Sequence, residues 1–171
     1  TLDTLIARFS QAGFIVFAIC HVSSMIALLR FIFLKEKRMA AGGGGILVLT
    51  PMERTRLRLA YPLAGSLFAA WTVLLVKSFG ELLKESVRSG ESQFRRYESW
   101  LIVCAIFMSF PMQFLFIQKG LQFFDAMYIV PVFSSSWTMG SVIMGALFWG
   151  EFSDFKGSQF FLFFAGIGII T

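Results

Sequence analysis

Apolar residues dominate five long stretches of the sequence, and most charged residues lie between them. These stretches fall near residues 12–34, 61–83, 100–118, 126–149 and 159–171. About 20 apolar residues in a helix cross the hydrocarbon core of a bilayer. The first four stretches reach about that length, and the fifth continues to the last residue. The pattern therefore predicts an all-α fold: a polytopic transmembrane helix bundle of about five spans, forming one membrane domain over residues 1–171.

The composition indicates a membrane protein rather than a soluble domain. Hydrophobic residues make up 57% of the chain, charged residues 15%, and the mean hydropathy is +0.74, whereas soluble domains carry about 25% charged residues. We therefore expect the lipid bilayer to surround the chain, in a plasma or endosomal membrane between which the sequence does not choose. Because the chain starts at Thr1 and stops at Thr171 inside an apolar stretch, we also expect it to be part of a longer protein.

The net charge of +5 is explained better by membrane orientation than by nucleic-acid binding, because the basic residues lie mainly in loops between apolar stretches. Seven of the 15 basic residues lie in or beside the linker 35–60, and Lys119 follows the third stretch. The positive-inside rule then places both loops in the cytoplasm. Within the linker, TPME at residues 50–53 matches a capping box. It predicts a short helix starting there, with Pro62 bending the join to the next span.

Residues 123–140, FFDAMYIVPVFSSSWTMG, place an acid, a proline, three serines and a threonine in or beside an apolar stretch. Polar groups in a bilayer usually face other helices or a water path. Asp125 either caps the helix N-terminus or provides a carboxylate at the inner mouth of a path for divalent cations. Pro131 either lies in the first turns, where proline costs little, or frees carbonyls that coordinate a cation. Beyond the helix, Glu151 lies either in a solvated loop or at the outer mouth.

Ser134, Thr138 and Ser141 follow each other at steps of four and three, so they share one face of the predicted helix. Small hydroxyl residues allow helices to approach closely and to hydrogen-bond across the interface. The same residues are also suited to line a hydrated path. Both interpretations stay open, and they can apply at different depths of the membrane.

The ionisable groups inside the other spans also allow both a structural and a functional interpretation. Lys77 lies one turn before Glu81, so it either reaches the interface and pairs with Glu81, or guards a transport path with it. His21 lies near the centre of the first span and either hydrogen-bonds another helix or relays protons. The sequence contains one histidine and none of the common catalytic or phosphate-binding motifs. We therefore expect no enzymatic activity and no cofactor.

Two segments of the chain, residues 61–84 and 113–151, resemble the NIPA-type magnesium transporters of the drug/metabolite transporter superfamily. The matching positions, in order, are Gly65, Ser66, Lys77, Gln118, Leu121, Asp125, Val130, Pro131, Phe148 and Glu151. The chain departs from the family pattern in having no asparagine, serines after Phe133, and FWGE at residues 148–151. The resemblance implies a divergent member and the second, C-terminal half of a drug/metabolite-transporter-like fold. The transport path would then lie between this half and the N-terminal half of the same protein.

The leading hypothesis for function is therefore transport of Mg²⁺ or another divalent cation, with Mg²⁺ as the cargo. The carboxylates of Asp125 and Glu151 are the candidate metal ligands, and the polar positions of the spans are the candidate path. One alternative is a transporter of an organic metabolite in the same superfamily, with Lys77 binding an anionic substrate and aromatic residues packing against it. Another is a membrane scaffold that transports nothing.

Overall fold

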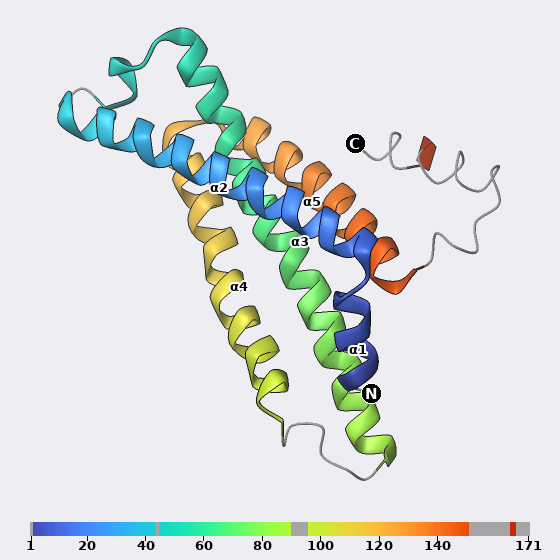
Figure 1. The fold of residues 1–171 in the computed structure, drawn as a ribbon. Coiled ribbons are helices and arrows are strands. Elements are labelled where there is room, and N and C mark those ends of the chain that lie inside the picture. Colours follow the sequence, from blue (N-terminus) through green and yellow to red (C-terminus); the bar gives the residue numbers. More distant parts are fainter. Residues whose placement is uncertain (1, 44, 90–95, 151–164, 167–171) are drawn as a thin grey trace.

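The structure is a computed structural model that describes residues 2–43, 45–89, 96–150 and 165–166. Along the chain it contains α1 (Leu2–Phe9), α2 (Ala12–Ala41), the short 3₁₀ helix η1 (Gly45–Val48), α3 (Pro51–Ser89), α4 (Tyr97–Phe123) and α5 (Ala126–Trp149) (Figure 1). No strand occurs among the described residues. Four of these helices, α2 to α5, are long and apolar enough to cross a membrane. The predicted all-α, polytopic bundle is therefore confirmed.

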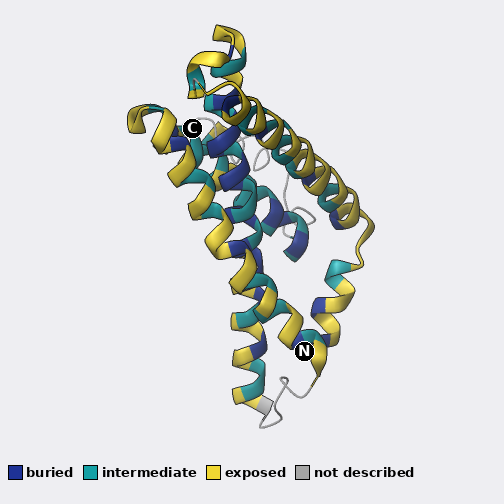
Figure 2. Ribbon diagram, turned by 90° about the vertical axis from the view of Figure 1, so that its left-hand side faces the viewer, coloured by how far each residue is buried: buried dark blue, intermediate teal, exposed yellow. Residues whose placement is uncertain are grey.

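Helix α3 is the centre of the bundle. In its most apolar window 61% of the residues are buried, whereas that share is 11% in α2 and in α4 and 17% in α5. Helices α4 and α5 both pack along α3 and contact each other much less. Exposed residues follow the outward faces of the helices, and buried residues face inward (Figure 2). Since the outer faces are apolar, this distribution is the one expected for helices surrounded by lipid.

Small residues let α3 approach its two main partners. A Cβ added at Gly65 of α3 would lie 3.2 Å from the backbone oxygen of Gln113 in α4. A Cβ at Gly140 of α5 would lie 3.4 Å from Cβ of Ala70. Two residues after Ala70, Thr72 Oγ1 donates a hydrogen bond of 3.0 Å to Ser109 Oγ, which links α3 to α4. Close packing and a hydroxyl bond are the usual means of joining helices in lipid.

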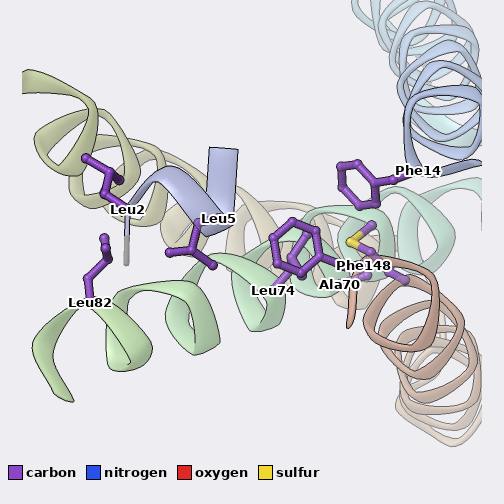
Figure 3. Packing of buried hydrophobic residues seen from close by; sticks show 8 residues of the cluster. Leu2, Leu5, Phe14, Ala70, Leu74, Leu82 and Phe148 are labelled. Atoms are coloured by element: carbon purple, nitrogen blue, oxygen red, sulfur yellow. The ribbon is translucent and has the colours of Figure 1, made fainter. Parts of the chain in front are cut away.

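Most of the buried apolar side chains in the described part of the chain belong to two clusters, one toward each end of the bundle. The cluster in Figure 3 joins α1, α2, α3 and α5 through Leu2, Leu5, Phe14, Ala70, Leu74, Leu82, Met144 and Phe148. The other cluster joins α2 and α3 around Leu57, Tyr61 and Ala64. Helix α1 was not predicted, because eight residues are too few for a span. Its Leu2 and Leu5, three residues apart, are both buried, and Leu2 lies beside Leu82 of α3.

Some helix bounds differ from the prediction. Helix α2 continues past residue 34 to Ala41, so the basic run at 35–38 is helical. The short helix predicted at residue 50 and the span predicted at residue 61 form one continuous helix, α3, with Pro62 inside it. The packing of the fully buried Pro62 offsets the backbone hydrogen bond that proline removes. The prediction for 126–149 matches α5, and the fifth predicted span, 159–171, lies almost entirely outside the described residues.

Candidate functional site

A groove opens on one side of α3, where α4 and α5 lie on α3 without closing on each other. Its volume is about 560 Å³. The lining comes from three helices: Ala69, Thr72, Val73, Val76 and Lys77 of α3, Phe110, Gln113, Phe114 and Ile117 of α4, and Phe133 and Trp137 of α5. Four of these side chains are aromatic, and Lys77 is the only charged one. The groove therefore combines a mainly apolar wall with one ammonium group.

Lys77 lies where the groove meets the end of α5. Its Nζ is 4.7 Å from the centre of the Trp149 ring, a cation–π contact. The guanidinium of Arg8 is also 4.7 Å from that ring. Arg8 Nη1 in addition donates to the backbone oxygen of Trp149 at 2.8 Å. A cation at the C-terminal carbonyls of α5 is favourable for the helix dipole, so Arg8 fixes α1 to this end of α5.

Glu81 does not line the groove but faces a second, smaller cavity. This cavity has a volume of about 200 Å³ and is lined by Thr4, Leu5, Arg8, Glu81, Leu82, Glu85 and Trp149. The predicted neighbours Lys77 and Glu81 thus line two different cavities, and Trp149, which lines the second, is also in contact with Lys77. Their direct pairing stays a prediction. Arg8 is the residue here that sequence reasoning missed, because its partners in α5 lie about 140 positions away.

Asp125 is the N-cap of α5. Its Oδ1 accepts a hydrogen bond of 3.0 Å from the backbone N–H of Met127, and its side chain is exposed. The predicted capping role is thereby confirmed, and the carboxylate remains open to the surroundings. A role at the mouth of a cation path stays a prediction. Its proposed partner Glu151 lies outside the described residues.

Ser134, Thr138 and Ser141, the hydroxyl face of α5, are not among the residues that line the groove. Ser134 Oγ donates to the backbone oxygen of Pro131 at 3.1 Å, and Ser141 Oγ donates to that of Thr138 at 3.0 Å. Ser134 is exposed, and Thr138 and Ser141 are half-buried. These serine hydroxyls thus donate within their own helix. Helix α5 runs unbroken through Pro131, which is exposed in its second turn.

His21 joins α2 to α3. It is buried, and its Nε2 donates to the backbone oxygen of Leu67 at 3.2 Å. The ring also lies edge-on to Trp71, with the ring centres 6.1 Å apart. This geometry confirms the predicted hydrogen bond to another helix. A proton relay through His21 is not needed to explain its burial.

Two ion-pair networks fasten the other end of the bundle, where the linker residues lie. Glu36 of α2 accepts hydrogen bonds of 2.9 Å from Lys119 of α4 and from the hydroxyl of Tyr61 in α3. Glu53 is bound by Lys35 and Arg38 and closes the predicted capping box with Thr50. The hydrogen bond from Lys35 is the main reason that the pKa of Glu53 falls to about 2. Sequence reasoning predicted the capping box but not these links between helices.

No group of three or more metal-ligating side chains gathers anywhere in the described ranges. The carboxylates near the ends of α3 and α5 are thus not gathered into such a group within this part of the chain.

Comparison with known proteins places this architecture in one family. The family model described as "Magnesium transporter NIPA" matches residues 1–171. One similar curated protein is described as "Probable magnesium transporter NIPA8" of Arabidopsis thaliana, with 24% identity over 98% of this chain. The chain spans 37% of the length of that relative. No solved structure matches the chain.

Proposed function

Because the chain belongs to the magnesium transporter NIPA family, we propose that the complete protein moves Mg²⁺, or another divalent cation, across a membrane. The match of the family model to residues 1–171 is the observation that carries this proposal. Four helices able to span a bilayer provide the scaffold that such transport requires. The chain supplies one part of the path, and the remainder of the protein supplies the other.

The polar features of α5 support a path along this helix. Asp125 presents an exposed carboxylate at the end of the bundle that we assign to the cytoplasm. Further along α5 lies the face with Ser134, Thr138 and Ser141, which is not packed into the core of the described helices. Hydroxyl and carbonyl oxygens suit an ion that retains most of its waters. Glu151 would provide the carboxylate at the opposite mouth.

The test is Mg²⁺ influx into proteoliposomes that contain the complete protein, followed with an internal Mg²⁺ indicator under an imposed membrane potential. Wild-type influx above that of empty liposomes is expected. Asp125→Asn keeps an oxygen acceptor for the helix cap but removes the charge, and it is expected to reduce influx several-fold. Lys84→Gln, on an exposed position of α3, serves as the control and is expected to leave influx unchanged.

The outcomes separate the parts of the proposal. If folded wild-type protein gives no influx, divalent-cation transport is wrong. If influx is normal in Asp125→Asn, transport stands and Asp125 is a helix cap only.

A further inference from the structure

A further groove, here called the α2 groove, lies between α2, α3 and α4. Its volume is about 550 Å³, and on α2 it is lined by Val22, Met25 and Leu29. None of the described residues that line it is charged. Its one side-chain hydroxyl outside the aromatic residues, on Ser109, is hydrogen-bonded to Thr72. Because α2 and α4 are long and apolar enough to cross a membrane, an apolar occupant such as an acyl chain suits this groove.

At one end the α2 groove continues into a cavity with charged residues. This basic cavity has a volume of about 380 Å³, and its lining includes Arg30, Glu36 and Lys119. Leu29 and Phe116 line both the α2 groove and the basic cavity. Helices α2 and α4 diverge from the end where Glu36 binds Lys119 (Figure 1). We propose that the two form one binding site for an anionic phospholipid, with an acyl chain in the α2 groove and the phosphate at the basic cavity.

The charges of the basic cavity favour a phosphate group. Arg30 is exposed and lies one turn inside the end of the predicted span 12–34, and no carboxylate of the described residues forms an ion pair with it. An arginine near a helix end in lipid reaches toward the headgroups, where its planar guanidinium binds phosphate through two hydrogen bonds.

Lys119 and Glu36 complete the charge balance of the cavity. Lys119 Nζ donates to both carboxylate oxygens of Glu36 at 2.9 Å. An ammonium has three N–H groups, so Lys119 can donate to a phosphate oxygen as well. Two cations and one carboxylate leave the lining with a net charge of +1. The single negative charge of a phosphodiester balances it.

The length of the α2 groove suits an acyl chain attached to such a phosphate. From Val22 to Arg30, α2 rises about 12 Å along its axis. The hydrocarbon layer of one leaflet is about 15 Å thick, half of the hydrocarbon core. Met25 of α2 faces Met108 and Met112 of α4 across the groove. Unbranched methionine side chains adapt their shape to an irregular partner such as an acyl chain.

Other occupants leave part of the site without a partner. An apolar helix of the complete protein would cover the α2 groove but would offer no anion to Arg30. A soluble phosphate would bind the basic cavity but would leave the apolar groove unfilled. The basic cavity also lies at the end of the bundle that the positive-inside rule assigns to the cytoplasm, where the leaflet contains the anionic lipids.

The experiment uses the complete protein in micelles of a nonionic detergent and two lipids with the same brominated acyl chains, phosphatidylglycerol and phosphatidylcholine. Trp71 lines the α2 groove, and bromine quenches tryptophan fluorescence at short range. The quenching of Trp71 itself is the difference between protein with Trp71 and protein with Trp71→Phe. Phosphatidylglycerol is expected to quench Trp71 at an about fivefold lower concentration than phosphatidylcholine, which is the effect of one net basic charge near an anionic headgroup.

Variants of Arg30 test the role of the charge. Arg30→Gln is expected to bring the ratio of the two concentrations to about one, whereas Arg30→Lys keeps a preference for phosphatidylglycerol. Lys37→Gln is the matched control, because Lys37 is an exposed cation near the same end of α2 that lines a different cavity. It is expected to keep the wild-type ratio. Thermal melting of each variant confirms that the protein is folded.

Wild type provides a second test that needs no variant at Arg30. Because salt screens charges, the preference for phosphatidylglycerol is expected to fall as the salt concentration rises from about 0.05 M to about 0.5 M. Quenching by phosphatidylcholine is expected to change little over the same range. A preference that does not respond to salt would show that charge is not its cause, and would overturn the proposal.

Four further results would overturn the proposal: no quenching of Trp71 by either lipid, a ratio near one in wild type, an unchanged ratio in Arg30→Gln, or an equal loss of preference in Lys37→Gln. A groove covered by another segment of the complete protein would give the first result. Because lipid binding is measured without Mg²⁺, the outcome is independent of the transport assay, and either proposal can fail alone.

Discussion

At the scale of single residues, Glu53 gives a prediction with a defined pH dependence. Its pKa falls from an ordinary value of 4.5 to about 2, chiefly through the hydrogen bond from Lys35. The ionised form therefore stabilises the folded state fully above about pH 4.5, and this contribution is lost as the pH falls toward 2. Both residues lie outside the predicted spans 12–34 and 61–83, so we expect water and buffer to reach them.

The measurement is the melting temperature of wild type and Glu53→Gln from pH 7 to pH 2. Wild type is expected to melt at a higher temperature at pH 7, and the difference is expected to close as the pH falls from about 4.5 to 2. Glu81→Gln, an exposed carboxylate elsewhere on α3, is the control. If the difference in melting temperature between wild type and Glu53→Gln does not change with pH, the charge of the carboxylate is not what stabilises this contact.

Contacts between residues that are close in sequence could be predicted, whereas contacts between residues that are far apart in sequence could not. The caps by Thr50 and Asp125 depend on residues two or three positions away, so the sequence pattern contains them completely. Glu36, in contrast, binds Lys119, which is 83 positions distant. Within the sequence Glu36 is only one acid in a basic run. Its role requires knowledge of which helix ends meet.

At the scale of helices, the contact between α3 and α4 depends on Gly65. An added Cβ there would lie 3.2 Å from the backbone oxygen of Gln113, which has little freedom to move. At Gly80, on the same helix, an added Cβ would meet nothing within 4 Å. Replacing either glycine with alanine changes the helix propensity by the same amount, but only the change at Gly65 also affects the packing against α4. The difference in stability between the two variants therefore measures the packing effect.

Alanine at Gly80 is expected to stabilise the protein by about 0.5–1 kcal/mol, because alanine is the better helix former. Alanine at Gly65 is expected to gain the same stability from helix propensity but to lose about 1–3 kcal/mol because the added Cβ crowds α4. Gly65→Ala is thus expected to be less stable than Gly80→Ala by about 1 kcal/mol or more. Unfolding in mixed micelles measures both. Equal stabilities would show that α3 and α4 do not approach each other closely at Gly65.

The helices themselves were largely predictable because the length and hydropathy of a span are properties of consecutive residues. The prediction matched α5 and was wrong about the break before residue 61, where buried contacts hold Pro62 inside α3. Helix α1 was missed because only its two buried leucines mark it, and their partner Leu82 is far away in sequence. The groove was also beyond prediction, since it needs Lys77, Gln113 and Trp137 from three helices in one place.

At the scale of the whole molecule, the structure gathers the groups that define orientation at one end of the bundle. The ion pair between Glu36 and Lys119 brings the end of α2 beside the end of α4, and Glu53 joins Lys35 at the start of α3. This end includes the basic linker that the positive-inside rule assigns to the cytoplasm. Lys84 lies on α3 near its other end, so Lys37 and Lys84 are expected on opposite sides of the membrane.

Cysteine labelling tests this orientation in intact cells. In the complete protein with its other cysteines, Cys20 and Cys104 included, changed to alanine, Lys37→Cys and Lys84→Cys are introduced singly; both positions are exposed. A membrane-impermeant maleimide is expected to label Lys84→Cys directly and Lys37→Cys only after permeabilisation. The reverse pattern would show that the chain has the opposite orientation in the membrane, with Asp125 on the outer side. Labelling of both from one side would contradict a membrane crossing by α3, because Lys37 lies in α2 close to the start of α3, where Lys35 pairs with Glu53, and Lys84 lies near the other end of α3.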